Sequence, residues 1–190
     1  LKDGGVLSVG YASTTDKATI ANVCQHSYFN LDGKPDALDH DIMIAAGHYL
    51  PTDDLQVPTG EIRAVDSTAF DLRSMASMRR QMEGDRISYD HNFCLADARG
   101  PKRSAALVRS VNSGVVLEVR TSEPGVQFYT GFKMNLPVPG LEGRRYGPYA
   151  GFCLETQNWP DAVNHPNFPD AVLCPGETLL QETDYVFSRT

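Results

Sequence analysis

The chain has 190 residues and a formal net charge of −7, and 41% of its residues are hydrophobic and 22% charged, as in ordinary globular domains with a buried core. No apolar run reaches the ~18 residues that cross a bilayer, and the longest basic runs, Arg79-Arg80 and Arg144-Arg145, are too sparse to follow a phosphate backbone. We therefore expect a single domain over residues 1–190 that binds neither a membrane nor nucleic acid, with a neutral small molecule as its partner.

Short runs rich in β-branched and aromatic residues predict strands along the chain. In chain order they span residues 6–11, 19–24, 41–45, 105–111, 115–121, 126–130, 151–156 and 185–188. Residues 115–121 also alternate, with Leu117 and Val119 on one face and Glu118 on the other, which is the period of a half-buried strand. The Asn-Ser-Gly sequence at 112–114 separates two of these runs and predicts a hairpin.

One segment has the period of a helix. Ser74 is a suitable N-cap for residues 75–82, in which three methionines would share one face and contact the core. Residues 133–150 are rich in glycine and proline and predict a long loop, a kind of segment that often carries function. Many short strands with one helix predict an all-β fold, a large antiparallel β-sandwich.

The cysteines stand at positions 24, 94, 153 and 174, without a CxxC pair. Their even number allows two disulfides, but the chain is long for a domain held by cystines, and their apolar neighbours indicate buried free thiols. Free thiols favour a reducing compartment, so we expect a cytoplasmic protein.

Several catalytic signatures are absent from the sequence: the P-loop, the dinucleotide-binding glycine motif, HExxH and GxSxG. Among the histidines only His40 and His48 are spaced closely enough to suggest a metal pair, and both have solvent-type neighbours. We therefore expect no metal and no other cofactor.

Three clusters of polar residues lie inside apolar, strand-like segments, at residues 22–31, 89–95 and 151–162. A buried carboxylate or imidazole is costly unless it is paired or hydrogen-bonded. The clusters therefore fit a shared polar pocket, and each also fits a core or turn group that is satisfied separately.

These clusters resemble, in the same order, the hallmark segments of aldose 1-epimerases, also called galactose mutarotases. The segments that carry the resemblance are NVCQHSYFNL (22–31), LPTD (50–53), PTGE (58–61), TAFDLR (68–73), YDHNFCL (89–95), PGVQFYTG (124–131), GFCLETQNWPDA (151–162), NHPNFP (164–169) and PGE (175–177). The resemblance covers essentially the whole chain. It implies the family's β-supersandwich and its activity, the interconversion of the α and β anomers of free aldoses such as glucose and galactose.

By this resemblance, His26 matches the family's general acid and Glu155 its general base, while Asp90 and Gln127 match residues that hydrogen-bond sugar hydroxyls. Trp159 is a candidate wall for the apolar face of a sugar and equally a candidate core residue. We expect four of these side chains to converge on one concave pocket: His26, Asp90, Gln127 and Glu155. In that pocket His26 and Glu155 should face each other across a gap that fits a sugar ring. Burial should raise the pKa of Glu155.

Two other functions fit the same residues. A sugar-binding module would use Asp90, Gln127 and Trp159 without turnover. A glycoside hydrolase would want two carboxylates flanking the scissile bond, whereas the resemblance pairs one carboxylate with one histidine.

The chain also departs from the family. Family members are nearly twice as long, and their N-terminal half supplies strands of the sandwich, a second histidine and an Asn-Arg pair that have no counterpart here. Residues 1–7 resemble a hairpin in the middle of a sheet. We therefore expect a fragment or a natural truncation, whose exposed sheet edge pairs with another chain or with the missing N-terminal half.

Overall fold

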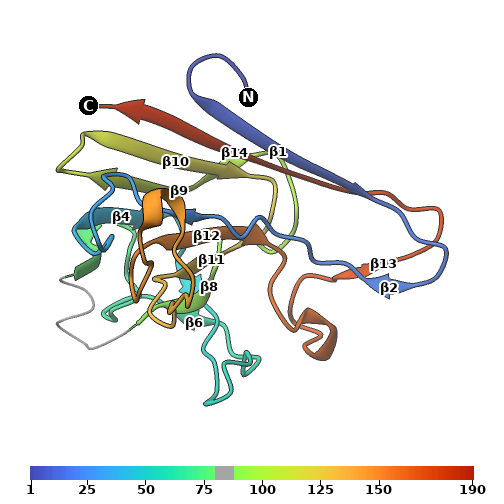
Figure 1. The fold of residues 1–190 in the computed structure, drawn as a ribbon. Coiled ribbons are helices and arrows are strands. Elements are labelled where there is room, and N and C mark those ends of the chain that lie inside the picture. The colour runs from blue at the N-terminus through green and yellow to red at the C-terminus, as the bar shows by residue number, and fades with distance from the viewer. Residues whose placement is uncertain (80–87) are drawn as a thin grey trace.

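The computed structural model describes residues 1–79 and 88–190 and folds them into two six-stranded sheets and one two-stranded ribbon, with antiparallel pairing throughout (Figure 1). The first sheet consists, in spatial order, of β1 (Val6–Ser13), β14 (Leu179–Arg189), β10 (Val115–Thr121), β9 (Arg103–Ser110), β4 (His40–Ile44) and β7 (Ala76–Ser77). The second consists of β3 (Tyr28–Phe29), β12 (Phe152–Gln157), β11 (Gly125–Tyr129), β8 (Asp90–Cys94), β5 (His48–Tyr49) and β6 (Arg63–Ala64). The ribbon joins β2 (Thr19–Ile20) to β13 (Val172–Leu173), and short 3-10 helices span Leu141–Gly143 and Ala162–Asn164. The all-β, antiparallel fold predicted from the sequence is confirmed.

Most predicted strands are present with shifted ends. The strand predicted at 115–121 coincides with β10, and the strand predicted at 185–188 is the last part of β14. The strand predicted at 19–24 was too long, because only its first two residues pair, in β2. The two-residue strands β3, β5, β6, β7 and β13 were not predicted, since two residues are too few to show a period.

The helix predicted at residues 75–82 is wrong at its start. Ala76 and Ser77 form β7, whose backbone pairs with β4 at the edge of the first sheet, and this pairing takes the place of helical hydrogen bonds. Met78 is buried in the core and is helical together with Arg79. The rest of the predicted helix lies outside the described residues.

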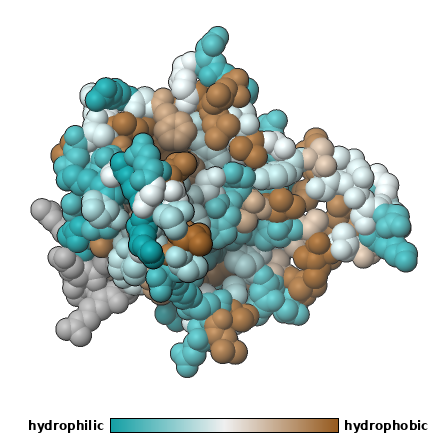
Figure 2. All heavy atoms as spheres, viewed as in Figure 1, coloured by the Kyte–Doolittle hydropathy of each residue, from teal (hydrophilic) through white to brown (hydrophobic). Residues whose placement is uncertain are grey.

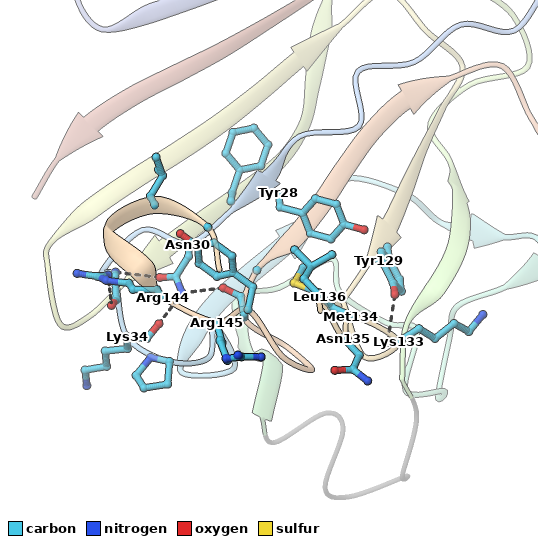
Figure 3. Close-up of a pocket in the computed structure, with 18 residues that line it drawn as sticks. Tyr28, Asn30, Lys34, Tyr129, Lys133, Met134, Asn135, Leu136, Arg144 and Arg145 are labelled. Carbon is cyan, nitrogen blue, oxygen red and sulfur yellow. Dashed lines mark hydrogen bonds between the residues drawn. The ribbon is translucent and has the colours of Figure 1, made fainter. Parts of the chain in front are cut away.

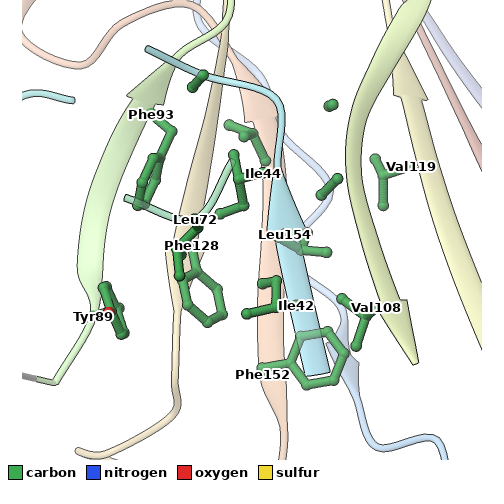
Figure 4. Close-up of a cluster of buried hydrophobic side chains, with 14 of the residues drawn as sticks. Ile42, Ile44, Leu72, Tyr89, Phe93, Val108, Val119, Phe128, Phe152 and Leu154 are labelled. Atoms are coloured by element: carbon green, nitrogen blue, oxygen red, sulfur yellow. The ribbon is translucent and has the colours of Figure 1, made fainter. Parts of the chain in front are cut away.

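The main hydrophobic core lies between the two sheets. Leu117 and Val119 of β10 are fully buried, while Glu118 between them pairs with Arg120 on the outer face, so the predicted alternation is confirmed. Figure 4 shows side chains of β8, β11 and β12 facing those of β4 and β9 across the sandwich. The second sheet therefore has one face in the core, and its other face is left for the polar residues at alternate positions.

The predicted burial of the cysteines is partly wrong, and His40 is buried although its sequence neighbours are of the solvent type. All the cysteines are free, and Cys94 and Cys153 are buried, but Cys24 is half-buried and Cys174 is exposed. His40 is fully buried in β4, where its Nε2 accepts a hydrogen bond from the backbone N–H of Leu31. A histidine that is held in this way is a structural element of the core.

The β2–β13 ribbon projects from the body of the sandwich, beside the C-terminal end of β1 and the N-terminal end of β14 (Figure 1). Brown side chains lie over this part of the surface in Figure 2, and Ile20, Val172 and Leu180 are among the exposed large hydrophobic residues. Elsewhere on this face apolar and polar side chains are interspersed. Within the described ranges, no helix has the length and apolar character needed to cross a membrane.

Candidate active site

Three neighbouring strands of the second sheet form the floor of the site. In β12, Phe152 and Leu154 point into the core, so Glu155 lies on the opposite, outer face. The register places Gln127 of β11 between Glu155 of β12 and Asn92 of β8. Strand pairing thus gathers on one patch the polar side chains that the sequence distributes over separate clusters.

His26 reaches this patch from the irregular segment between β2 and β3. Because β3 pairs with β12 and sets Tyr28 opposite Cys153, the residues just before β3 come close to Glu155. The Nε2 atom of His26 lies 3.6 Å from the Oε1 atom of Glu155. The Tyr28 ring stacks on the His26 imidazole, with ring centroids 5.3 Å apart. The expectation of a ring-sized gap between His26 and Glu155 is therefore wrong, because the β3–β12 pairing draws the two side chains together.

The two members of this pair have different environments. The side chain of His26 is 52% exposed and that of Glu155 is 9% exposed. Burial raises the pKa of Glu155, as predicted, and the nearby His26 and a hydrogen bond from Cys24 partly offset the rise. The Sγ atom of Cys24 lies 3.4 Å from Oε2 of Glu155, so the two carboxylate oxygens have different partners. Burial, followed by the charge on Glu155, raises the pKa of Cys24 to about 11, which keeps this thiol a donor.

Asp90 and Gln127 meet beside the pair. The amide of Gln127 donates a hydrogen bond of 3.0 Å to Oδ1 of Asp90, and the Lys133 ammonium lies 3.4 Å from the other oxygen, Oδ2. The Oε1 atom of Gln127 and the Nδ2 atom of Asn92 are buried and have no hydrogen-bond partner among the described residues. A buried acceptor and a buried donor that are unsatisfied within the protein are suited to the hydroxyl groups of a ligand.

All four of the convergent residues predicted from the sequence line one pocket of about 300 Å³. Its lining residues are His26, Leu50, Thr52, Gln56, Pro58, Asp90, Asn92, Gln127, Tyr129, Glu155, Gln157 and Pro160. The volume is at the lower end of the range typical of small-molecule sites. The prediction that these four side chains meet in one pocket is confirmed.

Trp159 does not line this pocket. It is 3% exposed and belongs to a second hydrophobic cluster with Leu50 and Phe168, where its Nε1 donates a hydrogen bond of 3.0 Å to the carbonyl of Pro124. The expectation that Trp159 forms a wall of the sugar pocket is corrected, because strand β12 ends at Gln157 and the chain then turns into the core. The other interpretation, a core tryptophan, agrees with the structure.

A larger cavity of about 1320 Å³ lies on the other side of Tyr129, between β3 and the loop at residues 133–150. Figure 3 shows the Tyr129 hydroxyl, which accepts a hydrogen bond from the backbone N–H of Lys133, and Arg144 and Arg145 at the far end of the cavity. Its charged lining residues are the cations Lys34, Lys133, Arg144 and Arg145. Its described lining residues include no carboxylate or imidazole to move a proton, so the smaller pocket is the candidate active site.

Comparison with known proteins identifies the family. The profile of the aldose 1-epimerase family matches residues 1–186. The chain belongs to the aldose 1-epimerase family. It is 47% identical to galactose mutarotase from Rattus norvegicus over 98% of this chain and 55% of that protein. It is 36% identical to aldose 1-epimerase from Escherichia coli, over 98% of this chain and 56% of that protein.

The chain has the same fold as a solved structure of an aldose epimerase homologue from C. elegans, with a TM-score of 0.91 and 28% sequence identity. The match covers 99% of this chain and 57% of that chain. The chain thus spans about half the length of the curated relatives it matches.

Several residues in the pocket or directly beside it were not predicted from the sequence. Cys24, Tyr28 and Asn92 contact the predicted residues directly or share their patch. The signal that could have identified Asn92 and Gln157 is strand alternation, because each lies two positions from a predicted residue. Lys133 carried no such signal, since it follows the end of β11 in an irregular loop.

Proposed function

We propose that this protein is an aldose 1-epimerase that interconverts the α and β anomers of free aldoses, with His26 as general acid and Glu155 as general base. The observation that carries the proposal is the 3.6 Å separation between His26 Nε2 and Glu155 Oε1 at the edge of a polar pocket. The two oxygens that exchange protons in mutarotation, the C1 hydroxyl and the ring oxygen, are bonded to the same carbon. An acid and a base that serve both oxygens must therefore be close neighbours.

In the proposed reaction, Glu155 removes the proton of the C1 hydroxyl while protonated His26 gives a proton to the ring oxygen. The bond between C1 and the ring oxygen breaks, and the open-chain aldehyde forms. Rotation about the C1–C2 bond presents the other face of the carbonyl, and the same two groups close the ring with their roles reversed. These steps require neither a metal nor a covalent intermediate.

The surroundings of Glu155 and Asp90 support these roles. Burial raises the pKa of Glu155, which makes its carboxylate a stronger base than one in water. Asp90, Gln127 and the unpartnered Oε1 atom of Gln127 offer charged and neutral hydrogen-bond partners for sugar hydroxyls. We assign Asp90 and Gln127 to binding and orientation of the sugar on this basis.

Polarimetry on freshly dissolved α-galactose and α-glucose tests the proposal. We expect the purified protein to speed the approach to anomeric equilibrium above the spontaneous rate, in proportion to protein concentration. Binding of the sugar, measured by calorimetry, without any increase in rate would identify a sugar-binding module in place of an enzyme. Comparison of the two sugars would show which configuration at C4 the pocket prefers.

We also propose that the protein works in the cytoplasm. The support is chemical: all four cysteines are free thiols, and one of them, Cys174, is exposed, as is usual in a reducing compartment. Cell fractionation followed by detection of the protein tests this assignment, and recovery from an oxidising compartment would contradict it.

A further inference from the structure

Three side chains of different chemistry converge where the acid–base pair lies. The Nε2 or Nδ1 atom of His26, the Sγ atom of Cys153 and a carboxylate oxygen of Glu155 all lie within 4.8 Å of one another. Cys153 and Glu155 are two positions apart on β12 and therefore point to the same face. His26 is brought to them by the pairing of β3 with β12.

One donor–donor distance already matches a zinc-type site, and the other two are no longer than 4.8 Å. Zn²⁺ binds nitrogen, sulfur and oxygen at about 2.0–2.3 Å in a tetrahedron, so two donors of one site lie about 3.3–3.8 Å apart. The His26–Glu155 separation of 3.6 Å is already in this range. The exposed His26 side chain gives access from the pocket, while Cys153 is fully buried and can hold the ion from below.

The second oxygen of Glu155 is held apart from the cluster. Cys24 donates to Oε2, whereas Oε1 faces His26. Oε1 is thus left to His26, and a carboxylate oxygen of Glu155 lies within 4.8 Å of both other donors. His26 and Glu155 also line the pocket, from which a fourth ligand such as water can reach a bound ion. Three protein ligands with an open fourth position is the arrangement of accessible zinc sites.

We propose that His26, Cys153 and Glu155 bind one Zn²⁺-type divalent cation, and that this binding inhibits the enzyme; the inhibitory part rests on the function proposed above. On binding, the Cys153 thiol releases its proton to solvent and the thiolate bonds to the metal, with no change of oxidation state. The metal takes the imidazole lone pair of His26 and the carboxylate oxygen of Glu155. Neither group can then exchange a proton with the sugar.

Cobalt(II) titration of the tag-free protein tests the site without reference to activity. We expect one equivalent of Co²⁺ to produce the strong visible bands of tetrahedral cobalt and a thiolate-to-cobalt charge-transfer band in the near ultraviolet, both abolished by excess Zn²⁺. Cys153→Ser should remove the charge-transfer band, and the exposed-cysteine control Cys174→Ser should keep it. His26→Gln, at an exposed position, should weaken cobalt binding at least ~10-fold, as even the loss of a ligand's outer partner does.

Absence of the bands in the wild-type protein, or a charge-transfer band that persists in Cys153→Ser with its circular dichroism unchanged, would overturn the metal site. Polarimetry with and without Zn²⁺ then tests inhibition, as the ratio of the two rates for each variant. The ratio should fall in the wild type and in Cys174→Ser and stay near one in Cys153→Ser. If cobalt binds but Zn²⁺ does not change the mutarotation rate, the inhibition alone is overturned. If the wild-type protein shows no mutarotation, the proposed function is overturned, and the cobalt spectra still decide whether the metal site exists.

Discussion

Glu155 is a residue whose environment opposes its charge. Its carboxylate is nearly buried and its pKa is raised by that burial, yet His26 and Cys24 direct hydrogen-bonding or charged groups at its two oxygens. A core position that served packing alone would be more stable with an apolar residue. The environment of Glu155 therefore supports the role in proton transfer proposed for it.

The first prediction concerns this proton chemistry. Glu155→Gln keeps the size of the side chain and removes the base, and His26→Asn removes the acid, so each should lower kcat at least ~10²-fold with little change in sugar affinity. Polarimetry checks this after subtraction of the spontaneous rate. Glu182→Gln, which alters an exposed carboxylate on β14, is the matched control and should keep full activity. Retention of more than half the activity by Glu155→Gln would show that Glu155 is not the base.

The same substitution should stabilise the fold in a pH-dependent way. The pKa of Glu155 is raised in the folded state above its ordinary value of 4.5. Between these two pKa values the folded state binds more protons than the unfolded state, so stability is lost as pH rises through this range. Glu155→Gln has no such loss. Its melting temperature should exceed that of the wild type at pH 7, and the difference should shrink toward pH 4. An equal difference at both pH values would contradict burial as the main cause.

Trp159→Phe separates a packing role from a sugar-binding role. The change removes the hydrogen bond from Nε1 to the Pro124 carbonyl and part of the packing against Phe168. We expect a loss of about 1–3 kcal/mol in the free energy of unfolding with an unchanged KM. Thermal or urea unfolding with sugar kinetics checks both, and a raised KM at unchanged stability would restore Trp159 to the pocket.

At the scale of elements, the site depends on the register of β8, β11 and β12. Gly125 of β11 pairs with Cys94 on one side and Gln157 on the other, next to the polar patch. A Cβ atom there would lie 2.6 Å from Oδ1 of Asn92 and 3.0 Å from Cδ1 of Trp159. The absence of a side chain at Gly125 lets a pocket residue and a core residue approach the same strand.

Gly125→Ala should therefore destabilise the protein by about 1–3 kcal/mol, as overpacking does, and should disturb Asn92 at the pocket floor. Gly10→Ala in β1 is the control, because its added Cβ would have only the Gln181 carbonyl at 3.9 Å. Thermal unfolding of the two variants checks the difference. Equal melting temperatures would mean that β11 shifts easily and that the register is not tightly held.

At the scale of the whole molecule, both sheets end in an edge strand near the N-terminal part of the chain. β1 is the edge of the first sheet and β3 that of the second, and Tyr28 of β3 is 47% exposed. Unpaired backbone at such edges tends to pair with a strand of another chain.

We propose that another polypeptide strand pairs with one of these edges. The purified chain should accordingly self-associate as its concentration rises, because a second copy is the available partner in such a sample. Sedimentation velocity over a hundredfold concentration range measures this. A monomer throughout the range would contradict the pairing.

Much of the site could be predicted from the sequence because its residues lie in long, specific motifs. Strand alternation around Leu117 and the resemblance of the segments around His26 and Glu155 led to the antiparallel fold and to four residues that share a pocket. The environment of Trp159 could not be predicted, since the side chain follows the end of β12 and its direction depends on how the next turn packs. The start of the predicted helix was wrong for a similar reason. Ala76 and Ser77 pair with β4, and the periodicity of a short segment carries no information about a strand that is distant in the sequence.

By itself, the sequence determined the all-β character, the family and the identity of the polar residues, because strand period and motif are local properties. Only the tertiary structure decided the 3.6 Å contact between His26 and Glu155, the place of Cys153 beside them and the removal of Trp159 to the core. These depend on pairing between strands far apart in the chain, and strand register is set by the packing of the whole sandwich.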